Sequence, residues 1–530
     1  MKNDSSRRQF LLRGSAAAAG LAAVGAVPGV RGEEPPAKQA AEHDRPHDGQ
    51  DYPRDHPGRV DGPVGGVTDR GKLVPSLSWK AGDPPVPVVT PDLPKLEWEM
   101  KDGFKEFHLH AMHTRREFLP GAWMDVWGYN DLCPGPTIEA TEGDRVRIVM
   151  HNMLPESTIL HIHGLEGPNR IDGVHGVNQE AVPPGGKVVY EFTLRQNGTL
   201  FYHSHGPMQE GLGMTGLFIV HPKEAYQPAV DHDFALTIQE WAIMPQSTIP
   251  NVTSMEFNWF TLNGRSAPYI TPLLVKLGSR VRIRFVNMSP IDHHPMHLHG
   301  HTFWVTGTEA GRIPETAWYP SNNVLVAVAQ AREIEFIANN PGDWVLHCHM
   351  FHHMMNHMAV MVGPMAMQMG MPAGSSAAAG MGMTQSGPAL SRENGPSIGR
   401  AMGENTSNER AVMTGMMKMD HKGHDMKDMP GMKDMPGMDM SGKRVPGYPA
   451  DMMDMPMQYS EEDLKKLNKP ETRGMRRNWF HGIEALHTVV RVLPSELYDK
   501  VVSGKGEVAP GASVPGGTPG EMPGMQHHDH

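Results

Sequence analysis

The sequence has only two cysteines and no long apolar run beyond its N-terminal region. Because Cys133 and Cys348 are the only cysteines among 530 residues, a disulfide-dense scaffold, a four-cysteine zinc site and a cysteine-ligated iron–sulfur cluster are excluded. No later stretch has 18 consecutive apolar residues, so we expect no stable membrane anchor in the mature protein. Positive charge is also scarce, since 48 Lys and Arg stand against 59 Asp and Glu, and the net charge of −11 argues against nucleic-acid binding.

Methionine and histidine, by contrast, are abundant. The chain has 41 Met and 31 His, and both side chains are metal ligands, the thioether soft and the imidazole intermediate. The composition therefore points to metal chemistry.

Residues 1–32 have the features of an export signal. Arg7 and Arg8 precede an apolar, small-residue stretch over 11–30, which is the order of a secretory signal peptide. The paired arginines resemble a twin-arginine signal. The alternative is a single anchoring helix, which glycines and a proline within that stretch disfavour. We expect export to the periplasm or the cell exterior.

Composition divides the rest of the chain into a strand-rich core and flanking segments. Short β-branched runs alternate with Gly, Pro and Asn over about 96–364, which is typical of antiparallel β-sandwiches. Ser460 begins a capped helix, and the apolar spacing from Trp479 to Val502 predicts a second one, docked on the core. The flanking segments are a mobile Pro-rich leader (33–95), a Met/His-rich low-complexity tail (365–460), a helical appendage (461–504) and a disordered end (505–530).

An internal repeat divides the core into two domains, 96–222 and 228–364. The segments that recur are 143–148 with 278–283, 161–163 with 297–299, and 200–205 with 344–349. Each copy has the size of an ordinary sandwich domain.

Four short motifs in these domains supply histidines in pairs. They are His161 and His163, His203 and His205, His297 and His299, and His347 and His349. Residues i and i+2 of a strand face the same side, so each pair presents two imidazoles to one place. Eight imidazoles suit a cluster of more than one copper. Cys348 faces the other way and suits a separate copper bound by thiolate, for which His294, His353 and Met358 supply two imidazoles and a weak axial group.

This layout resembles the multicopper oxidases. All four copper motifs of that family occur here in family order, and Pro134–Ile138 with Gly143-Asp144 is similar to its first cupredoxin domain. The resemblance covers about 96–364. It implies an all-β core of two cupredoxin-like Greek-key β-sandwich domains, followed by a largely disordered Met-rich C-terminal extension that contains a short helical segment.

The resemblance also implies four coppers per chain and assigns their ligands. The type 1 copper takes His294, Cys348, His353 and Met358, the type 2 copper takes His161 and His297, and the type 3 pair takes His163, His203, His205, His299, His347 and His349. Electrons are expected to pass from Cys348 to its neighbours His347 and His349, and Asp172 to assist proton delivery.

The spacing of the motifs is similar to that of the two-domain subgroup. Only 89 positions separate His205 from His294, which leaves no room for a middle domain. Domain 1 lacks a type 1 site, because Thr158, Ser204 and Gln209 align with the type 1 ligands of domain 2. Two-domain members form head-to-tail rings in which neighbouring chains share each cluster, so the resemblance predicts a homotrimer.

The expected activity is oxidation of phenols, Cu(I) or another metal ion coupled to reduction of O2 to water. Clustered methionines in the tail are similar to Met-rich segments of copper-resistance oxidases, which suggests a role in copper tolerance. A linker that merely tolerates methionine is the alternative for the tail. The alternatives for the whole protein are a periplasmic copper-sequestering protein and a copper nitrite reductase, whose thiolate ligand would fall where Ser204 stands. Cys133, without neighbouring ligands, is expected to be a buried structural thiol.

Overall fold

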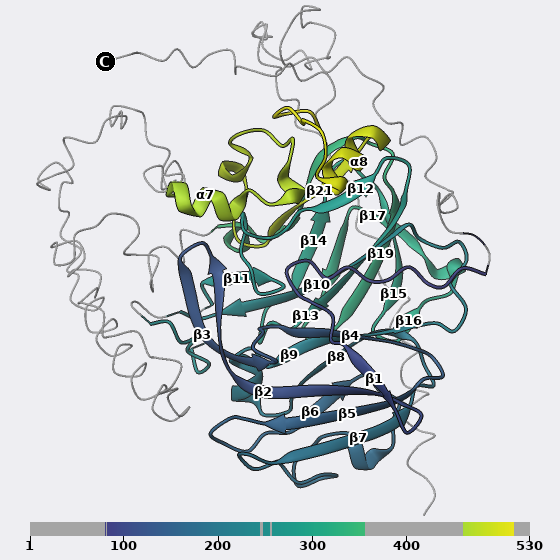
Figure 1. The fold of residues 1–530 in the computed structure, drawn as a ribbon, viewed down its shortest axis with the longest axis vertical. Coiled ribbons are helices and arrows are strands. Elements are labelled where there is room, and N and C mark those ends of the chain that lie inside the picture. The colour runs from purple at the N-terminus through teal and green to yellow at the C-terminus, as the bar shows by residue number, and fades with distance from the viewer. Residues whose placement is uncertain (1–79, 81, 244–246, 255–256, 356–458, 514–530) are drawn as a thin grey trace, which may run out of the picture. The chain divides into compact units, whose positions relative to one another are not determined.

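The computed structural model describes residues 80, 82–243, 247–254, 257–355 and 459–513 (Figure 1). The predicted signal (1–32), most of the leader, Met358 and nearly all of the predicted Met/His-rich tail lie outside these residues. Within the part of the chain that is described, no helix is long and apolar enough to cross a membrane.

Domain 1 consists of two sheets packed face to face. Its strands are β1 (Trp98–Lys101), β2 (Phe104–Leu119), β3 (Ala122–Tyr129), β4 (Gly135–Thr141), β5 (Arg145–Asn152), β6 (Leu160–His163), β7 (Lys187–Thr193), β8 (Gly198–Ser204) and β9 (Thr215–His221), with η1 (Asn169–Ile171) and α1 (Pro207–Gly211) between them. One sheet has the order β1-β2-β5-β7 with β3 beside β2, and the other has the order β4-β9-β8-β6. Alternate side chains of both sheets, such as Phe107, Ile148 and Phe218, fill the core between them.

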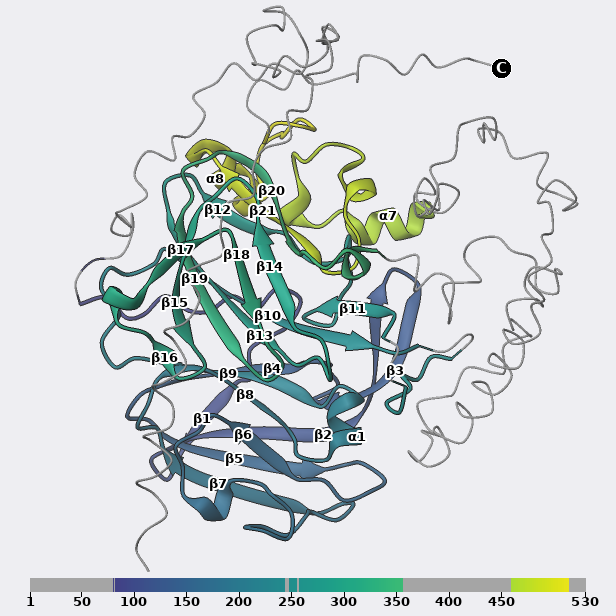
Figure 2. The same ribbon diagram turned by 180° about the vertical axis from the view of Figure 1, so that it is seen from behind.

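Domain 2 repeats this arrangement (Figures 1 and 2). Its elements are β10 (His232–Trp241), β11 (Trp259–Leu262), β12 (Leu273–Lys276), β13 (Arg280–Asn287), β14 (His294–Leu298), β15 (Phe303–Thr308), β16 (Gly311–Arg312), η2 (Glu315–Ala317), β17 (Tyr319–Ser321), β18 (Asn323–Val326), β19 (Ala331–Ile337), β20 (Gly342–Cys348), η3 (Phe351–Met354) and β21 (His487–Leu493). The sheets have the orders β11-β10-β13-β19-β15-β16, with β17 beside β15, and β12-β21-β20-β14-β18. Parallel pairs β10/β13 and β12/β21 match β2/β5 and β4/β9 of domain 1. The all-β, two-sandwich fold predicted from the repeat is therefore confirmed.

The C-terminal segment corrects the predicted helical appendage. Helix α7 (Glu461–Leu467) begins with the expected capping box at Ser460, and η6 (Pro470–Thr472), η7 (Trp479–Gly482) and α8 (Ser495–Ser503) follow. The predicted helix from Trp479 to Val502 is right only at its end, where α8 lies, and wrong at its centre, which is strand β21, whose seven residues are all buried. A short apolar run fits a buried strand as well as a helix, and the β-branched residues of β21 favour the pleated surface.

Strand β21 also corrects the boundaries of domain 2. It lies between β12 and β20 and contributes Val489, Val490 and Val492 to the domain core. Domain 2 is therefore not complete within 228–364, since its last strand comes from beyond residue 459. The Met-rich stretch predicted as a tail is an insertion between η3 and the segment that contains β21.

Two segments expected to be mobile or disordered are packed in part. The end of the predicted leader is fixed because Val88 is buried, Val89 bridges to Phe234 of β10, and Asp92 accepts hydrogen bonds from the Thr271 backbone (2.9 Å) and from Lys469 Nζ (2.8 Å). The start of the predicted disordered end, 505–513, is fixed because Gly511 donates to the Met475 carbonyl (3.2 Å) and Ser513 to the Asp343 carboxylate. Both segments are therefore held by contacts with residues that are distant in the sequence.

A buried polar network joins the two domains. Thr199 on β8 donates to Glu333 on β19 (2.6 Å), and Arg284 on β13 donates to both (2.6 and 2.7 Å). Arg280 and Glu335, both fully buried, form an ion pair in the same sheet. Because charges removed from water are stable only when paired, this network fixes how the domains meet.

Candidate metal centres

Three side chains of domain 2 form a site that we call the cysteine site. His294 begins β14, Cys348 ends β20, and His353 lies in η3, and all three are fully buried. Cys348 Sγ is 3.7 Å from His294 Nδ1 and 3.5 Å from His353 Nδ1, and the two nitrogens are 3.1 Å apart. A trigonal set of two imidazoles and one thiolate is the ligand set of blue-copper centres.

The outer nitrogens of both imidazoles are held by oxygen atoms. Ser289 Oγ is 2.7 Å from His294 Nε2, and Asp292 Oδ2 is 3.2 Å from His353 Nε2. Such partners fix the ring orientation and direct the other nitrogen to the metal. Burial raises the pKa of the Cys348 thiol to about 12. Because the thiolate is the form that binds copper, metal loading must release this proton.

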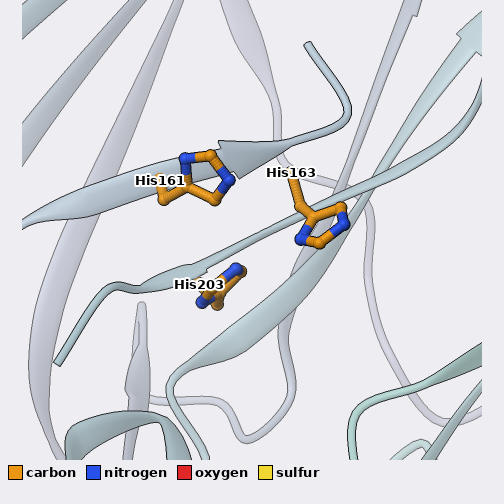
Figure 3. A group of neighbouring side chains, drawn as sticks. All are labelled: His161, His163 and His203. Carbon is orange, nitrogen blue, oxygen red and sulfur yellow. The ribbon is translucent and has the colours of Figure 1, made fainter. Parts of the chain in front are cut away.

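A second group of histidines, the first half-site, belongs to domain 1. Strands β6 and β8 place the ligand atoms of His161, His163 and His203 within 4.8 Å of one another, and Figure 3 shows these three rings gathered between the strands. His205, just after β8, completes it, with its ring 5.5 Å from that of His161. His161 Nδ1 donates to the Asp172 carbonyl (2.5 Å) and His203 Nδ1 to the Ser204 carbonyl (2.9 Å), which leaves both Nε2 atoms free for a metal.

The second half-site is the corresponding group in domain 2. The ligand atoms of His297, His299 and His347 lie within 4.8 Å of one another, and Nε2 of His299 is 3.0 Å from Nε2 of His347. The ring of His349 is 5.3 Å from that of His347. His297 and His347 again donate from Nδ1 to backbone carbonyls, of Asn322 (2.6 Å) and Cys348 (2.8 Å).

The histidines of both half-sites are poised to bind metal. Burial, together with the neighbouring imidazoles, lowers the pKa of His163 to about 4, and burial likewise lowers that of His347 to about 4. These rings are therefore neutral at pH 7, which is the form that ligates a metal ion. An imidazole-only donor set beside a buried thiol fits copper better than a hard cation such as Mg²⁺ or Ca²⁺.

The structure brings the eight histidines predicted to bind the copper cluster together in two separate sets of four. The first half-site lies in the sheet β4-β9-β8-β6 and the second in the sheet β12-β21-β20-β14-β18. Among the described residues, ring contacts join histidines within each half-site and none joins the two. The set of eight imidazoles is thus divided between the two domains of the chain.

The remaining predicted residues have clear positions. The Asp172 carboxylate is 3.7 Å from His161 Nδ1 and accepts from Asn178 Nδ2 (3.1 Å), so it lies at the first half-site. Met358 lies outside the described residues. Cys133 is buried among apolar side chains, which agrees with the expected structural thiol.

Domain 1 replaces the cysteine site with a hydrogen-bond network. Thr158 and Ser204 both donate to Gln209 Oε1, over 2.6 and 2.7 Å, and Gln209 Nε2 donates to Glu156 (2.7 Å). Met214 is fully buried. The polar groups that stand in place of the metal ligands satisfy one another.

His487 is a site residue that the sequence analysis missed. It lies opposite His347 across β20 and β21, the two rings stack with centroids 4.9 Å apart, and its Nδ1 donates to the Glu484 carbonyl. The available signal was that a histidine begins a run of β-branched residues. Because that run was assigned to a helix, the pairing of His487 with His347 was not predicted.

Comparison with known proteins agrees with this geometry. Two family models, both described as multicopper oxidase, match residues 110–225 and 242–365. The chain is 47% identical over 120 residues to an iron transport multicopper oxidase of Epichloe festucae, covering 22% of this chain and 19% of that protein. It is 32% identical over 240 residues to Laccase-1 of Cryptococcus neoformans, covering 36% of this chain and 38% of the laccase.

Two further matches are a copper resistance protein and a solved structure. Copper resistance protein A of Pseudomonas syringae is 29% identical over 148 residues, covering 28% of this chain and 24% of that protein. The matched part therefore spans less than two-fifths of each of these curated relatives. A solved structure described as multicopper oxidase mgLAC is 31% identical, with a TM-score of 0.44, covering 49% of this chain and 81% of that one.

Proposed function

This chain belongs to the multicopper oxidase family, and from that premise we propose that it couples one-electron oxidation of a donor to four-electron reduction of O2 to water. The observation that carries the proposal is the position of Cys348. Its Sγ lies in the cysteine site, while its covalent neighbours His347 and His349 belong to the second half-site. One short stretch of backbone therefore connects the two kinds of centre.

The ligand sets support four coppers per chain. When bound, copper supplies one-electron redox chemistry at the cysteine site and O2 reduction at the cluster. His294, Cys348 and His353 would hold the type 1 ion, His161 and His297 the type 2 ion, and the other six histidines of the two half-sites the type 3 pair. The protein's contribution is to fix ring orientation through the carbonyl partners of Nδ1.

Asp172 is proposed to deliver protons for water formation. Its carboxylate is 43% exposed, so it reaches solvent on one side, and it faces His161 on the other. Replacing it by Asn preserves the shape and removes the proton carrier. We expect Asp172→Asn to slow O2 reduction by about 10²-fold or more, while anaerobic reduction of the cysteine site by a donor is unchanged. Equal O2 reduction in both proteins would remove this role.

The division of the cluster supports a homotrimer arranged head to tail, in which each cluster combines a first half-site from one chain with a second half-site from the next. Co-expression of His161→Ala with His297→Ala tests this. Each variant alone lacks one half-site, but a mixed ring contains an interface where both are intact, so activity should return. No recovery, or full activity in a monomer at micromolar concentration, would contradict the shared cluster.

The donor is proposed to be a phenol, Cu(I) or another metal ion, with a role in copper tolerance. The relatives' names refer to iron transport, laccase and copper resistance, so they support an oxidase without selecting its donor. The Met-rich insertion lies in the sequence between Met355 and Tyr459. Its thioethers are soft Cu(I) ligands. Both ends join segments that contact the cysteine site, since the Leu486 backbone donates to the His353 carbonyl (3.1 Å).

Oxygen uptake with alternative donors tests this proposal. Copper-loaded full-length protein and a variant lacking residues 365–457 would be compared with Cu(I) and with a phenol. Loss of Cu(I) turnover alone in the deletion variant would support copper tolerance. Equal turnover in both proteins would indicate a general laccase. No uptake with any donor would favour copper sequestration without turnover, the alternative in which the bound copper is only stored.

Two further proposals follow from the sequence. We propose delivery to the periplasm or beyond through the twin-arginine-type segment at 1–32, which Arg7→Lys with Arg8→Lys should abolish in a fractionation experiment. A copper nitrite reductase is disfavoured, because Ser204 occupies the place of the thiolate ligand in domain 1 and is bonded to Gln209. Consumption of nitrite by the copper-loaded protein would reverse this choice.

A further inference from the structure

Three histidines of domain 1 gather on the outer face of the sheet β1-β2-β5-β7. His108 and His110 lie on β2, and His151 lies on β5, where the parallel register places it opposite His110. Their neighbours Leu109 and Met150 belong to the domain core. Successive residues of a strand face opposite sides, so the three imidazoles point away from that core. We call them the surface histidine cluster.

The rings of the surface histidine cluster lie close together. The centroids of His110 and His151 are 4.8 Å apart with planes inclined by 11°, and those of His108 and His151 are 5.8 Å apart. Burial, together with the neighbouring imidazoles, lowers the pKa of His110 and of His151. The lower pKa favours the neutral imidazole, which is the form that binds a metal ion.

A fixed carboxylate orients His108. Glu106 Oε1 is 3.1 Å from His108 Nε2, and Glu106 also accepts from Arg147 (2.8 Å) and Lys101 (3.1 Å). Hydrogen bonds from these two cations hold the pKa of Glu106 at about 2. The carboxylate is therefore ionised at pH 7, and His108 Nε2 donates to it. The Nδ1 atom of His108 is then available as a ligand, and a carboxylate partner of this kind is typical of metal-binding histidines.

Asn130 fixes the backbone that carries two of the three histidines. Its side chain accepts from the His110 backbone N–H (2.9 Å) and donates to the His108 carbonyl (3.0 Å), and its own backbone N–H donates to the His110 carbonyl (2.9 Å). Sites built on fixed strands hold their ligands more precisely than sites on loops. The surface histidine cluster is therefore held in place before any ion binds.

The cluster borders an open hollow of about 450 Å³ that also contains carboxylates. Its lining includes His108, His110, Glu97, Glu99 and Glu106. Imidazole nitrogens with carboxylate oxygens nearby form a donor set that suits a divalent transition metal ion. The hollow leaves room for such an ion with its remaining water ligands.

We propose that the surface histidine cluster binds a Cu²⁺ ion, in addition to the coppers of the cysteine site and the two half-sites. Among divalent first-row metals, Cu²⁺ binds nitrogen and oxygen donors most strongly. The first half-site lies in the other sheet of domain 1, on the far side of the domain core. An ion at the surface histidine cluster is therefore separate from the proposed redox centres, and its binding does not depend on the proposed function.

The copper content of the full chain tests this site. Wild type, the double variant His110→Ala with His151→Ala, and the control His481→Ala would be loaded with excess Cu²⁺ and dialysed, with folding checked by circular dichroism. The double variant should retain one Cu²⁺ fewer per chain, and its electron paramagnetic resonance spectrum should lack a Cu²⁺ signal split by imidazole nitrogens. His481→Ala replaces an exposed histidine outside the cluster and should match wild type.

Two results would overturn the proposal. One is an equal copper content in wild type and the double variant, and the other is an equal loss in His481→Ala, which would indicate that single exposed histidines hold the ion. If the double variant failed to fold, His108→Ala, at a side chain that is 48% exposed, would take its place with the same expected loss. An absence of oxidase turnover would leave this copper count unchanged, so the two proposals fail separately.

Discussion

The imidazole of His487 stacks on that of His347, with ring centroids 4.9 Å apart and planes inclined by 13°. His347 belongs to the second half-site and is the covalent neighbour of Cys348, whereas His487 lies beyond the Met-rich insertion. A residue distant in sequence therefore supports a proposed copper ligand. The segment after the insertion therefore contributes a residue to the proposed metal centre.

This contact predicts that His487 is a positioning residue. His487→Ala removes the ring that holds His347, and loss of such support costs about 10–100-fold in metal affinity or activity. His487→Phe retains an aromatic surface and should restore much of the loss. Copper content after dialysis measures the effect, and His481→Ala, at an exposed position of the same segment, is the control. Equal copper content in all variants would refute the role.

The two cysteines are predicted to behave differently. Cys348→Ser should abolish blue absorption and donor oxidation together, because the thiolate is the strong ligand of the cysteine site. Cys133→Ala should retain both and lower the free energy of unfolding by about 1 kcal/mol, since it removes one buried atom from an apolar cluster. Spectra and turnover of both variants decide this, and turnover retained in Cys348→Ser would contradict the proposed electron path.

Removal of the insertion and removal of everything after Gly363 are predicted to differ. The truncation deletes β21, and each of its fully buried aliphatic side chains contributes about 1.5–3 kcal/mol, so their combined loss is comparable to the net stability of an ordinary domain. The internal deletion of 365–457 retains β21 and should give folded, blue protein. Circular dichroism and copper content distinguish the two. A stable, copper-binding truncation would show that β21 is dispensable.

The buried ion pairs of Glu335 within domain 2 predict a pH dependence of stability. Burial alone raises the pKa of Glu335, but Arg282, Arg312 and Arg280 outweigh it and hold the pKa at about 2, below its ordinary value of 4.5. A depressed folded-state pKa contributes stability that is complete above pH 4.5 and is lost as the pH falls toward 2. Urea unfolding of the wild-type protein across this window should show the decline.

Replacing this carboxylate isolates its contribution. Glu335→Gln leaves buried guanidinium groups such as Arg280 without their anion, which costs about 3–5 kcal/mol at pH 7, and should flatten the dependence between pH 4.5 and 2. Glu191→Gln breaks an ion pair with Arg147 whose carboxylate is 42% exposed, and should change stability by no more than about 1 kcal/mol. Identical pH profiles for wild type and Glu335→Gln would contradict the assignment.

Local sequence patterns predicted that the paired histidines lie close together. The His-x-His alternation of β6, β8, β14 and β20 depends only on strand geometry, and His161, His163 and His203 meet as that geometry requires. The repeat likewise predicted the polar replacement at Ser204 and Gln209. Such inferences need no knowledge of distant parts of the chain.

Features decided by distant contacts were not predictable in this way. The apolar run at 487–493 has no periodicity that distinguishes a buried strand from a helix. Only its pairing with β12 and β20 shows that it is a strand. Assigning that strand to a helix meant that His487 was not predicted as a site residue. The same reason explains the leader, whose Asp92 is fixed by Thr271 of domain 2 and by Lys469 of the C-terminal segment.

The most direct test of the central claim is the stoichiometry of O2 consumption by the copper-loaded, full-length protein with a one-electron donor in excess. Donor equivalents oxidised per O2 consumed and any hydrogen peroxide released would be measured together, with Cys348→Ser as the blank. The account predicts four equivalents per O2 and no peroxide. Two equivalents with stoichiometric peroxide, or uptake equal to that of Cys348→Ser, would contradict it.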